Sequence, residues 1–304
     1  MFEPASHLSS EAKAYLRDPA PPIAPIDWLD ADAVGELRRA LIEQGAVEVE
    51  ALKGDWVSRD ETWGGVPCVR FAADEGALDR SPVLVHLHGG AYLIGSSRTN
   101  AAVVIPIAQR TGLPVVSIDY RLAPEHPFPA AVDDAVAAVQ ALREAAPVQA
   151  IFGESAGGGL AIAVAVALRD AGVALPARLG VLSPWVDLTC SGDSYRTLVN
   201  VDPVFSDPEI PPALAHAYAR DRVAEPLASP VFADHRGLPP TLIQVGSREV
   251  LFSDACRLDE AMRRAGVDTV LDVWDGLWHV WQLDAALPES TVALDQLAAF
   301  LVMP

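Results

Sequence analysis

The chain has 304 residues, of which 51% are hydrophobic, and a formal net charge of −19 from 22 Lys and Arg against 41 Asp and Glu. This length and apolar content suit a packed globular protein, either one sizeable domain with insertions or two small ones. The negative charge repels phosphate backbones and anionic lipid, and no basic cluster compensates for it, so we expect no nucleic-acid or membrane partner.

The N-terminal segment lacks the basic and apolar regions of a secretory signal, and no later run reaches the roughly 18 apolar residues that span a bilayer. We therefore expect a cytoplasmic protein. Cys68, Cys190 and Cys256 are scattered and lack the spacing of metal ligands. We expect them to be reduced thiols in packed positions and predict no metal site.

Two helical stretches, residues 9–17 and 30–44, open the chain, and the Pro-rich segment 18–28 separates them. This N-terminal arm does not have the pattern of a sheet. After Gly54 the pattern changes, and short apolar runs rich in β-branched residues predict strands at 65–73, 82–88, 113–120, 148–153, 177–184, 241–246 and 269–274.

Helical stretches at 130–146 and 155–172 lie between some of these strands. Strands that alternate with helices predict an α/β fold with a mostly parallel sheet covered on both faces. Between Ser183 and Pro240 no strand is evident, and two short helical pieces, 194–200 and 208–221, lie among prolines. We interpret this interval as an insertion over the sheet.

Residues 153–157, Gly-Glu-Ser-Ala-Gly, fit the pattern G-x-S-x-G between a predicted strand and a predicted helix. A serine on such a turn is held in strained backbone geometry, and the flanking glycines leave room for it, so its hydroxyl is exposed at the C-terminal edge of the sheet. Ser155 is therefore the candidate nucleophile. The alternative is a glycine-rich turn with an idle serine.

A serine nucleophile needs N–H donors directed at the carbonyl oxygen that becomes negative. Gly89 and Gly90 directly follow the strand at 82–88, and Ala156 follows the serine at a helix N-terminus, so these three residues are the candidate oxyanion hole. An ordinary tight turn is the alternative for the glycine pair. We expect His86 and His88 to be structural, because the general base should lie downstream of the serine.

Three histidines follow the serine in the sequence. His216 lies in the predicted insertion, and His235 lies in a polar turn before the next strand. His279 comes just after the strand at 269–274, where a loop brings an imidazole to the C-terminal edge of the sheet. We predict that His279 is the general base, with a packing role as the alternative.

The segments HGGAYLIGS, DYRLAPEHPFPA, GESAGGGLA, LSPWVDLT and WHVW, in this order and spacing, resemble the bacterial hormone-sensitive-lipase-like esterases, or family IV lipolytic enzymes. The resemblance covers about residues 55–304. It implies an α/β-hydrolase fold and hydrolysis of small carboxylic esters with short to medium acyl chains, without a cofactor. It also implies a cap made of the arm 1–50 and an insertion at about 188–225 over a catalytic domain 51–304, and a homodimer formed through the last strand.

The same resemblance implies that Asp119, Arg121 and Glu125 are structural and order the loops near the site, with help in shaping the pocket as the alternative. The family commonly has an aspartate three residues after the glycine that ends the seventh strand, and here that position is Glu249. Either carboxylate can orient an imidazole. We therefore predict Glu249 as the third member of the triad.

Asp254 is the alternative acid. We expect it to lie in the first turn of a helix that Ser253 caps, where the helix dipole favours a negative charge. That explanation requires no catalytic role for it.

Substrate specificity should depend on the side chains beside these motifs, although ordinary packing explains each of them equally well. The candidate pocket walls are Tyr92, Leu93, Trp185, Phe205, Trp278 and Val280. Two rival functions remain: an amidase or deacetylase with the same triad, and a non-catalytic ligand-binding receptor of this fold. The receptor is disfavoured because Ser155 and His279 are both present.

Overall fold

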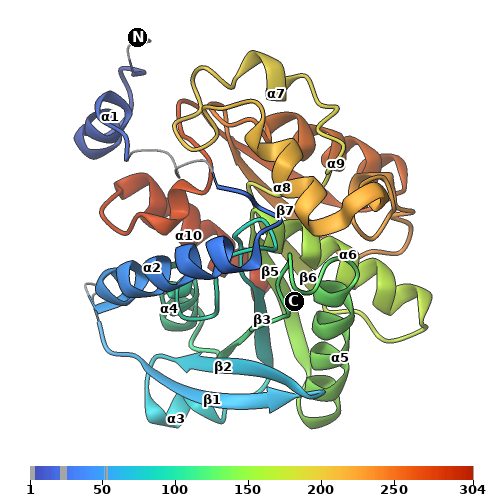
Figure 1. Cartoon of the computed structure of the whole chain (residues 1–304). Coiled ribbons are helices and arrows are strands. Elements are labelled where there is room, and N and C mark those ends of the chain that lie inside the picture. The colour runs from blue at the N-terminus through green and yellow to red at the C-terminus, as the bar shows by residue number, and fades with distance from the viewer. Residues whose placement is uncertain (1–3, 21–25, 51, 53, 304) are drawn as a thin grey trace.

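The computed structural model describes residues 4–20, 26–50, 52 and 54–303. Its centre is an eight-stranded sheet in the spatial order β1-β2-β4-β3-β5-β6-β7-β8 (Figure 1). The strands are β1 Val57–Trp63, β2 Val66–Ala72, β3 Val83–Leu87, β4 Val115–Ile118, β5 Val148–Glu154, β6 Arg178–Leu182, β7 Thr241–Gly246 and β8 Thr269–Trp274.

Strands β4, β3, β5, β6, β7 and β8 run parallel, whereas β1 and β2 are antiparallel to their neighbours. Every residue of β3, β4 and β7 is buried, as a parallel sheet covered on both faces requires. The predicted fold class is confirmed. The carboxyl ends of the parallel strands meet at one edge of the sheet.

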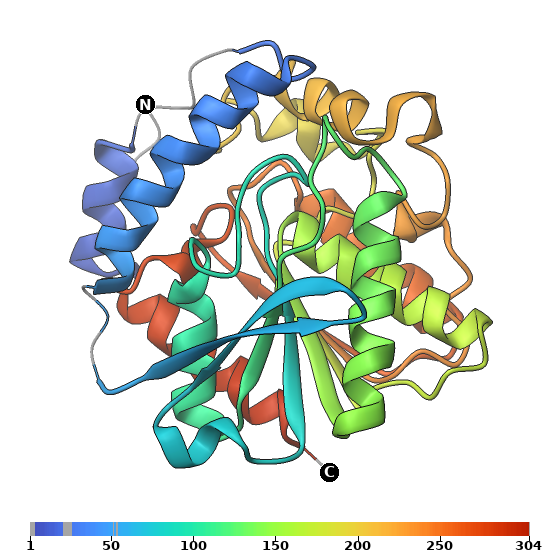
Figure 2. The same ribbon diagram turned by 60° about the horizontal axis from the view of Figure 1, so that its bottom comes forward.

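Helices cover both faces of the sheet, as Figure 2 shows. Alternate residues of the strands point to opposite faces, so Leu84 and Phe152 pack with α4 Ala101–Thr111 and α10 Pro288–Leu301. Their neighbours Val85 and Ile151 belong to the larger core on the other face. Helices α5 Ala130–Ala145, α6 Ala156–Asp170 and α9 Phe252–Arg264 contribute to that core.

The sequence analysis did not predict β1, α4 or α10. Strand β1 is a half-exposed edge strand that pairs only with β2 and carries charged residues. The N-terminal helices are α1 Ser10–Arg17 and α2 Ala31–Glu50, and a four-residue helix, α3 Glu75–Leu78, follows β2.

Residues 183–240 connect β6 to β7 and contain helices and turns, with no strand in this fully described interval. They include α7 Ser194–Thr197, α8 Ile210–Ala219 and the 3₁₀ turns η1 Arg220–Arg222 and η2 Pro230–Phe232. A third 3₁₀ turn, η3 Trp281–Leu283, follows β8. Within the described part of the chain, no helix has the length and apolar character needed to cross a membrane.

All three cysteines are free and at least partly buried. Burial raises the pKa of the Cys68 and Cys190 thiols to about 12, so both stay protonated at neutral pH. These two cysteines occupy packed positions, as predicted from the sequence.

Candidate active site

Ser155 lies at the sharp turn between β5 and α6, at the C-terminal edge of the sheet. Its backbone has φ 54° and ψ −121°, which is strained for a residue with a side chain. The Ser155 N–H donates to the carbonyl of Leu182 on β6 at 2.8 Å, and its carbonyl accepts from Trp185 N–H at 2.9 Å. The neighbouring strand therefore fixes the strained turn.

The glycines on either side of the serine allow this turn to approach the end of β3. A Cβ atom at Gly153 would lie 2.4 Å from the carbonyl oxygen of Leu87, and one at Gly157 would lie 1.9 Å from the same atom. Both distances are far below van der Waals contact. The spacing of the G-x-S-x-G pattern is thus a steric requirement of the contact between the serine turn and β3.

The structure brings Ser155, His279 and Glu249 together as a continuous hydrogen-bonded chain. His279 Nε2 lies 3.0 Å from Ser155 Oγ, and His279 Nδ1 lies 2.8 Å from Glu249 Oε2. Glu249 follows β7 and His279 follows β8, so the three side chains come from three neighbouring strand ends. An ionised carboxylate accepts the Nδ1 proton, which leaves Nε2 free to accept the serine hydroxyl proton.

The second oxygen of Glu249 is also bound. Its Oε1 accepts from the N–H of Gly246 at 2.7 Å and from the hydroxyl of Ser183 at 2.8 Å. Ser183 Oγ in turn accepts from the N–H of Val280, next to His279, at 3.1 Å. Ser183 therefore connects the loop of the acid to the loop of the imidazole, a role that the sequence analysis did not identify.

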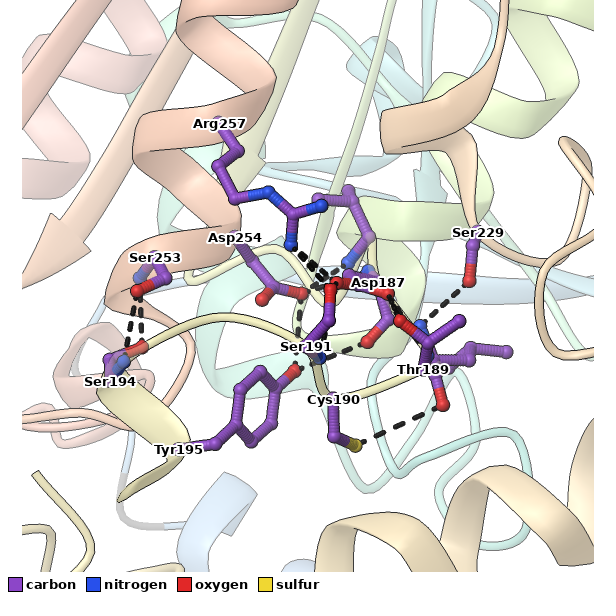
Figure 3. Close-up of polar contacts among 12 residues, drawn as sticks. Asp187, Thr189, Cys190, Ser191, Ser194, Tyr195, Ser229, Ser253, Asp254 and Arg257 are labelled. Carbon is purple, nitrogen blue, oxygen red and sulfur yellow. Dashed lines mark hydrogen bonds and ion pairs between the residues drawn. The ribbon is translucent and has the colours of Figure 1, made fainter. Parts of the chain in front are cut away.

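Asp254 has no hydrogen bond to this chain and is fully buried. Figure 3 shows it directed at residues of the insertion. Its Oδ2 accepts from the N–H groups of Val186 and Asp187 at 3.0 and 2.9 Å, and from the hydroxyl of Tyr195 at 3.2 Å. Burial, reinforced by the negative charge of Asp187, raises the pKa of Asp254 well above its usual range.

The prediction that Ser253 caps this helix is wrong. The N-cap of α9 is Leu251, and Ser253 instead exchanges hydrogen bonds with Ser194 in the insertion. Asp254 does lie in the first turn, but the buried amides of the insertion bind its carboxylate.

The other downstream histidines lie elsewhere. His216 is exposed on α8, and His235 is buried with its Nε2 2.8 Å from the carbonyl oxygen of Pro230. Both positions differ from the strand-end loop that carries His279.

The structure corrects the prediction for Gly89. Its N–H donates to Oε1 of Glu154 at 2.6 Å, so this N–H is not available to an oxyanion. Oε1 of Glu154 also accepts from the side-chain amide of Asn100 at 2.7 Å, and Oε2 lies 2.8 Å from His86 Nε2. Burial raises the pKa of the Glu154 carboxyl, but the facing His86 and the N–H of Gly89 outweigh burial and hold it below its ordinary value.

The main-chain N–H groups of Gly90, Ala91 and Ala156 lie near Ser155, and none of the three has an acceptor among the described residues. Ala156 begins α6, where the helix dipole favours negative charge. Gly90 and Ala91 have φ 110° and 54° and line the same cavity as Ser155. Gly90 and Ala156 were predicted from the sequence as donors, and Ala91 was not.

The two upstream histidines have structural contacts. His86 Nδ1 lies 2.8 Å from Ser117 Oγ, so both ring nitrogens of His86 have polar partners. The Nδ1 of His88 lies 2.8 Å from the carbonyl oxygen of Gly89, and its ring stacks on Tyr120 with 4.2 Å between centroids. Burial lowers the pKa of His88.

The residues of the segment 119–130 hold loops in place. Asp119 accepts from the N–H of Ser97 at 2.7 Å, and Arg121 pairs with Asp134 at 2.7 Å. Glu125 pairs at 2.7 Å with Arg38 of α2. This ion pair ties the N-terminal arm to the loop beside the site.

A cavity of about 490 Å³ opens beside Ser155 and His279. The arm contributes Tyr15, Trp28 and Leu41 to its wall, and the insertion contributes residues 203–207, Ile210 and Leu214. Of the predicted pocket walls, only Phe205 and Val280 line this cavity.

The other four predicted wall residues, Tyr92, Leu93, Trp185 and Trp278, are buried in the packing, and the prediction is wrong for them. Tyr92 stacks on Tyr218 with 3.8 Å between centroids, and Trp278 stacks on Tyr15 with 4.2 Å.

Among the described residues, no group of three His, Cys, Asp or Glu side chains is placed to hold a metal ion. Beside the cavity lie a serine, an imidazole hydrogen-bonded to a carboxylate, and main-chain N–H donors, a set of groups that can carry out acyl transfer.

Comparison with known proteins identifies the fold and the class of enzyme. Residues 84–283 match the model of a family described as having the alpha/beta hydrolase fold. The chain is 41% identical over 222 residues to an acetyl-hydrolase of Streptomyces hygroscopicus, covering 72% of this chain and 74% of that protein. It is 36% identical over 223 residues to an esterase of Acinetobacter venetianus, with coverage of 72% and 74%.

Solved structures are similar over nearly the whole chain. An esterase from the bacterial hormone-sensitive lipase family superposes with a TM-score of 0.85 at 39% identity, covering 96% of both chains. A hormone-sensitive lipase from a metagenome library gives a TM-score of 0.84 at 33% identity. The chain therefore belongs to the α/β-hydrolase family, among the bacterial hormone-sensitive-lipase-like esterases, and is an enzyme of the serine hydrolase class.

Proposed function

We propose that this enzyme hydrolyses small, neutral carboxylic esters with short to medium acyl chains through a Ser155–His279–Glu249 triad and an acyl-enzyme intermediate. The observation that carries the proposal is the hydrogen-bonded chain from Glu249 through His279 to Ser155, which ends at the wall of an apolar cavity. The two relatives described above are named acetyl-hydrolase and esterase, which supports an ester substrate.

In the first half-reaction, His279 Nε2 takes the hydroxyl proton of Ser155, and Oγ attacks the ester carbonyl carbon. The carbonyl oxygen becomes an oxyanion that accepts from the N–H groups of Gly90, Ala91 and Ala156. The imidazolium formed at His279 faces the carboxylate of Glu249, which is already held by two other donors.

The tetrahedral intermediate collapses when His279 returns the proton to the alkoxide oxygen, and the alcohol leaves. The second half-reaction repeats these steps with water. His279 removes a proton from the water, hydroxide attacks the acyl-enzyme carbonyl, and the carboxylic acid is released as Ser155 regains its proton.

The lining of the cavity supports an uncharged substrate. Among the described residues that line it, none is a Lys or Arg, and the two carboxylates are Asp207 and the buried Glu154, whose oxygens already have partners. A carboxylate or phosphate on the substrate would lose hydration there without gaining a cationic partner. We propose that the arm 1–50 and the insertion at about 188–225 form the cap that limits the size of the acyl group.

The test uses a fluorophosphonate probe and a panel of p-nitrophenyl esters. We expect the probe to label Ser155 and to fail on Ser155→Ala, and we expect the wild type to release a burst of p-nitrophenol that Ser155→Ala lacks. A matched p-nitroanilide series measures ester against amide preference. Retained burst kinetics in Ser155→Ala, or a clear preference for the anilides, would overturn the proposal.

A further inference from the structure

We propose that the insertion between β6 and β7 has a second task besides covering the substrate: through Asp202 it holds the turn that carries the acid Glu249. Asp202 is then a positioning residue for the triad, and it acts through Glu249 without touching the substrate. This inference rests on the function proposed above.

The main-chain groups of Val250, the residue after the acid, are both bound by side chains of the insertion. The Val250 N–H donates to Oδ2 of Asp202 at 2.8 Å. The Val250 carbonyl accepts from the hydroxyl of Ser194. The peptide units on both sides of Val250 are therefore fixed by residues 48 and 56 positions away in the sequence.

Asp202 also fixes the loop that contacts the general base. Its Oδ1 accepts from the N–H groups of Val204 at 2.8 Å and Phe205 at 3.1 Å. The Phe205 ring lies against the His279 ring with 5.1 Å between centroids. One carboxylate thus joins the turn of the acid to a side chain packed on the imidazole.

The Asp202 carboxylate is buried, and both of its oxygens accept hydrogen bonds. Asp202 is 2% exposed, and its two oxygens accept three main-chain N–H groups. Without it, the N–H of Val250 would be buried without a hydrogen-bond partner, which is destabilising. The turn would be expected to move to recover a hydrogen bond, and Glu249 would move with it.

Glutamate makes such support more important than aspartate would. It has one more rotatable bond, so its carboxylate reaches more positions, and catalysis requires groups held to within about 0.5 Å. Gly246 and Ser183 fix one oxygen of Glu249. The hydrogen bond from Val250 N–H to Asp202 fixes the backbone from which the glutamate side chain extends.

The test is a double-mutant cycle of wild type, Asp202→Asn, Glu249→Gln and the double variant, with kcat and KM measured on p-nitrophenyl acetate. Asparagine keeps the size of the side chain, but its amide nitrogen cannot accept a hydrogen bond. When the amide oxygen keeps the two bonds to Val204 and Phe205, the nitrogen faces the Val250 N–H. We expect Asp202→Asn to lower kcat by about 10- to 100-fold with KM within about 3-fold, as for a catalytic group displaced by about 1 Å.

In the Glu249→Gln background, we expect the same substitution to lower kcat by less than about 3-fold, because Asp202 acts through the acid. A residue that only stabilises the fold or shapes the pocket would lower kcat equally in both backgrounds, and that result overturns the inference. An unchanged kcat in Asp202→Asn overturns it as well.

Asp254→Asn is the matched control. Asp254 is also a buried aspartate that accepts two main-chain N–H groups, but its acceptor contacts are with Val186, Asp187 and Tyr195. We expect the kcat of Asp254→Asn to stay within about 3-fold of wild type, because Asp202 and Ser194 still bind the main chain of Val250.

If Asp202→Asn does not fold, the same cycle with Ser194→Ala, which removes the partner of the Val250 carbonyl, decides the question by the same criteria. Wild-type kcat in Glu249→Gln would overturn the proposed triad and this inference together. A large loss in Glu249→Gln with equal effects of the second substitution in both backgrounds overturns this inference alone.

Discussion

The hydroxyl of Ser183 donates a hydrogen bond to Oε1 of Glu249 at 2.8 Å. The two residues are 66 positions apart in the sequence but follow neighbouring strands, β6 and β7. Because of this contact, the two oxygens of the carboxylate have different partners. Oε1 is anchored by Ser183 and by the N–H of Gly246, and Oε2 is left for His279. The extra methylene of glutamate is thereby accommodated without loss of the bond to the imidazole.

Glu249→Gln tests whether this carboxylate orients the base. An amide that keeps its oxygen on Ser183 and Gly246 presents its NH₂ to His279, which favours the wrong imidazole tautomer. We expect kcat on p-nitrophenyl butyrate to fall by about 10⁴-fold, with the circular dichroism spectrum unchanged. Full turnover in Glu249→Gln together with loss of turnover in a folded Asp254→Asn would transfer the role to Asp254.

Glu249→Asp tests the division of the two oxygens. Aspartate is one methylene shorter, so its carboxylate cannot reach Ser183, Gly246 and His279 at once from the same backbone. We expect kcat to fall by about 10- to 100-fold, which corresponds to a displacement of about 1 Å, and KM to change little. Equal turnover of the aspartate and glutamate enzymes would show that the anchor is unnecessary.

The fold was predictable from the sequence where burial imposes a pattern. The wholly buried strands β3, β4 and β7 are mostly apolar and were identified, as was the serine turn. Strand β1 was missed because, at the edge of the sheet, it has no continuous buried face and carries Arg59, Asp60 and Glu61. Helix α4 was missed because it contains Pro106 and an apolar, β-branched run typical of a strand.

The site was predictable only as far as order along the chain determines position. Strand ends of a parallel sheet meet at one edge, which is why Ser155, Glu249 and His279 could be named together. Which N–H groups near the serine are free could not be predicted, because the Gly89 N–H is taken by a side chain 65 residues away. The direction in which a loop side chain points could not be predicted from the sequence either. Tyr92, at φ 64°, packs into the core instead of lining the cavity.

Glu154→Gln tests the network that holds the loop of Gly89 to the serine turn. The carboxylate accepts from Gly89 N–H and from Asn100, and it faces His86, so an amide would place a donor against at least one of these groups. We expect the free energy of unfolding to fall by about 2–4 kcal/mol and kcat to fall as well. Urea unfolding and ester turnover measure the two effects, and unchanged values of both would contradict a role for this network.

Ile210→Trp tests whether the cavity limits the acyl chain. Ile210 lines the cavity from α8, so a larger side chain there occupies part of the 490 Å³. We expect kcat/KM for p-nitrophenyl hexanoate to fall by about 10-fold or more while that for the acetate stays within about 3-fold, since each buried methylene contributes about 0.8 kcal/mol. Val292→Trp, at a half-exposed position on α10, is the matched control. An equal loss of kcat/KM for the acetate and the hexanoate would show that the acyl chain does not occupy the part of the cavity beside Ile210.

His235→Gln tests a pH dependence of stability that is separate from catalysis. Burial lowers the pKa of His235 from 6.5, and its ring nitrogen bonds the carbonyl of Pro230. Above pH 6.5 the histidine is neutral in both folded and unfolded chains. As the pH falls below 6.5, the unfolded chain binds a proton that the folded chain does not, so the free energy of unfolding decreases by up to about 1.4 kcal/mol per pH unit for this residue.

Glutamine at this position does not titrate, so the variant lacks that contribution. At pH 8 we expect it to be about 1 kcal/mol less stable than the wild type, because the bond to Pro230 is weakened. Between pH 6.5 and 5 the wild type should lose stability faster than the variant, and the difference between them should narrow. Urea unfolding followed by tryptophan fluorescence measures both curves, and parallel curves over this range would show that His235 binds its proton equally in the folded and unfolded chains.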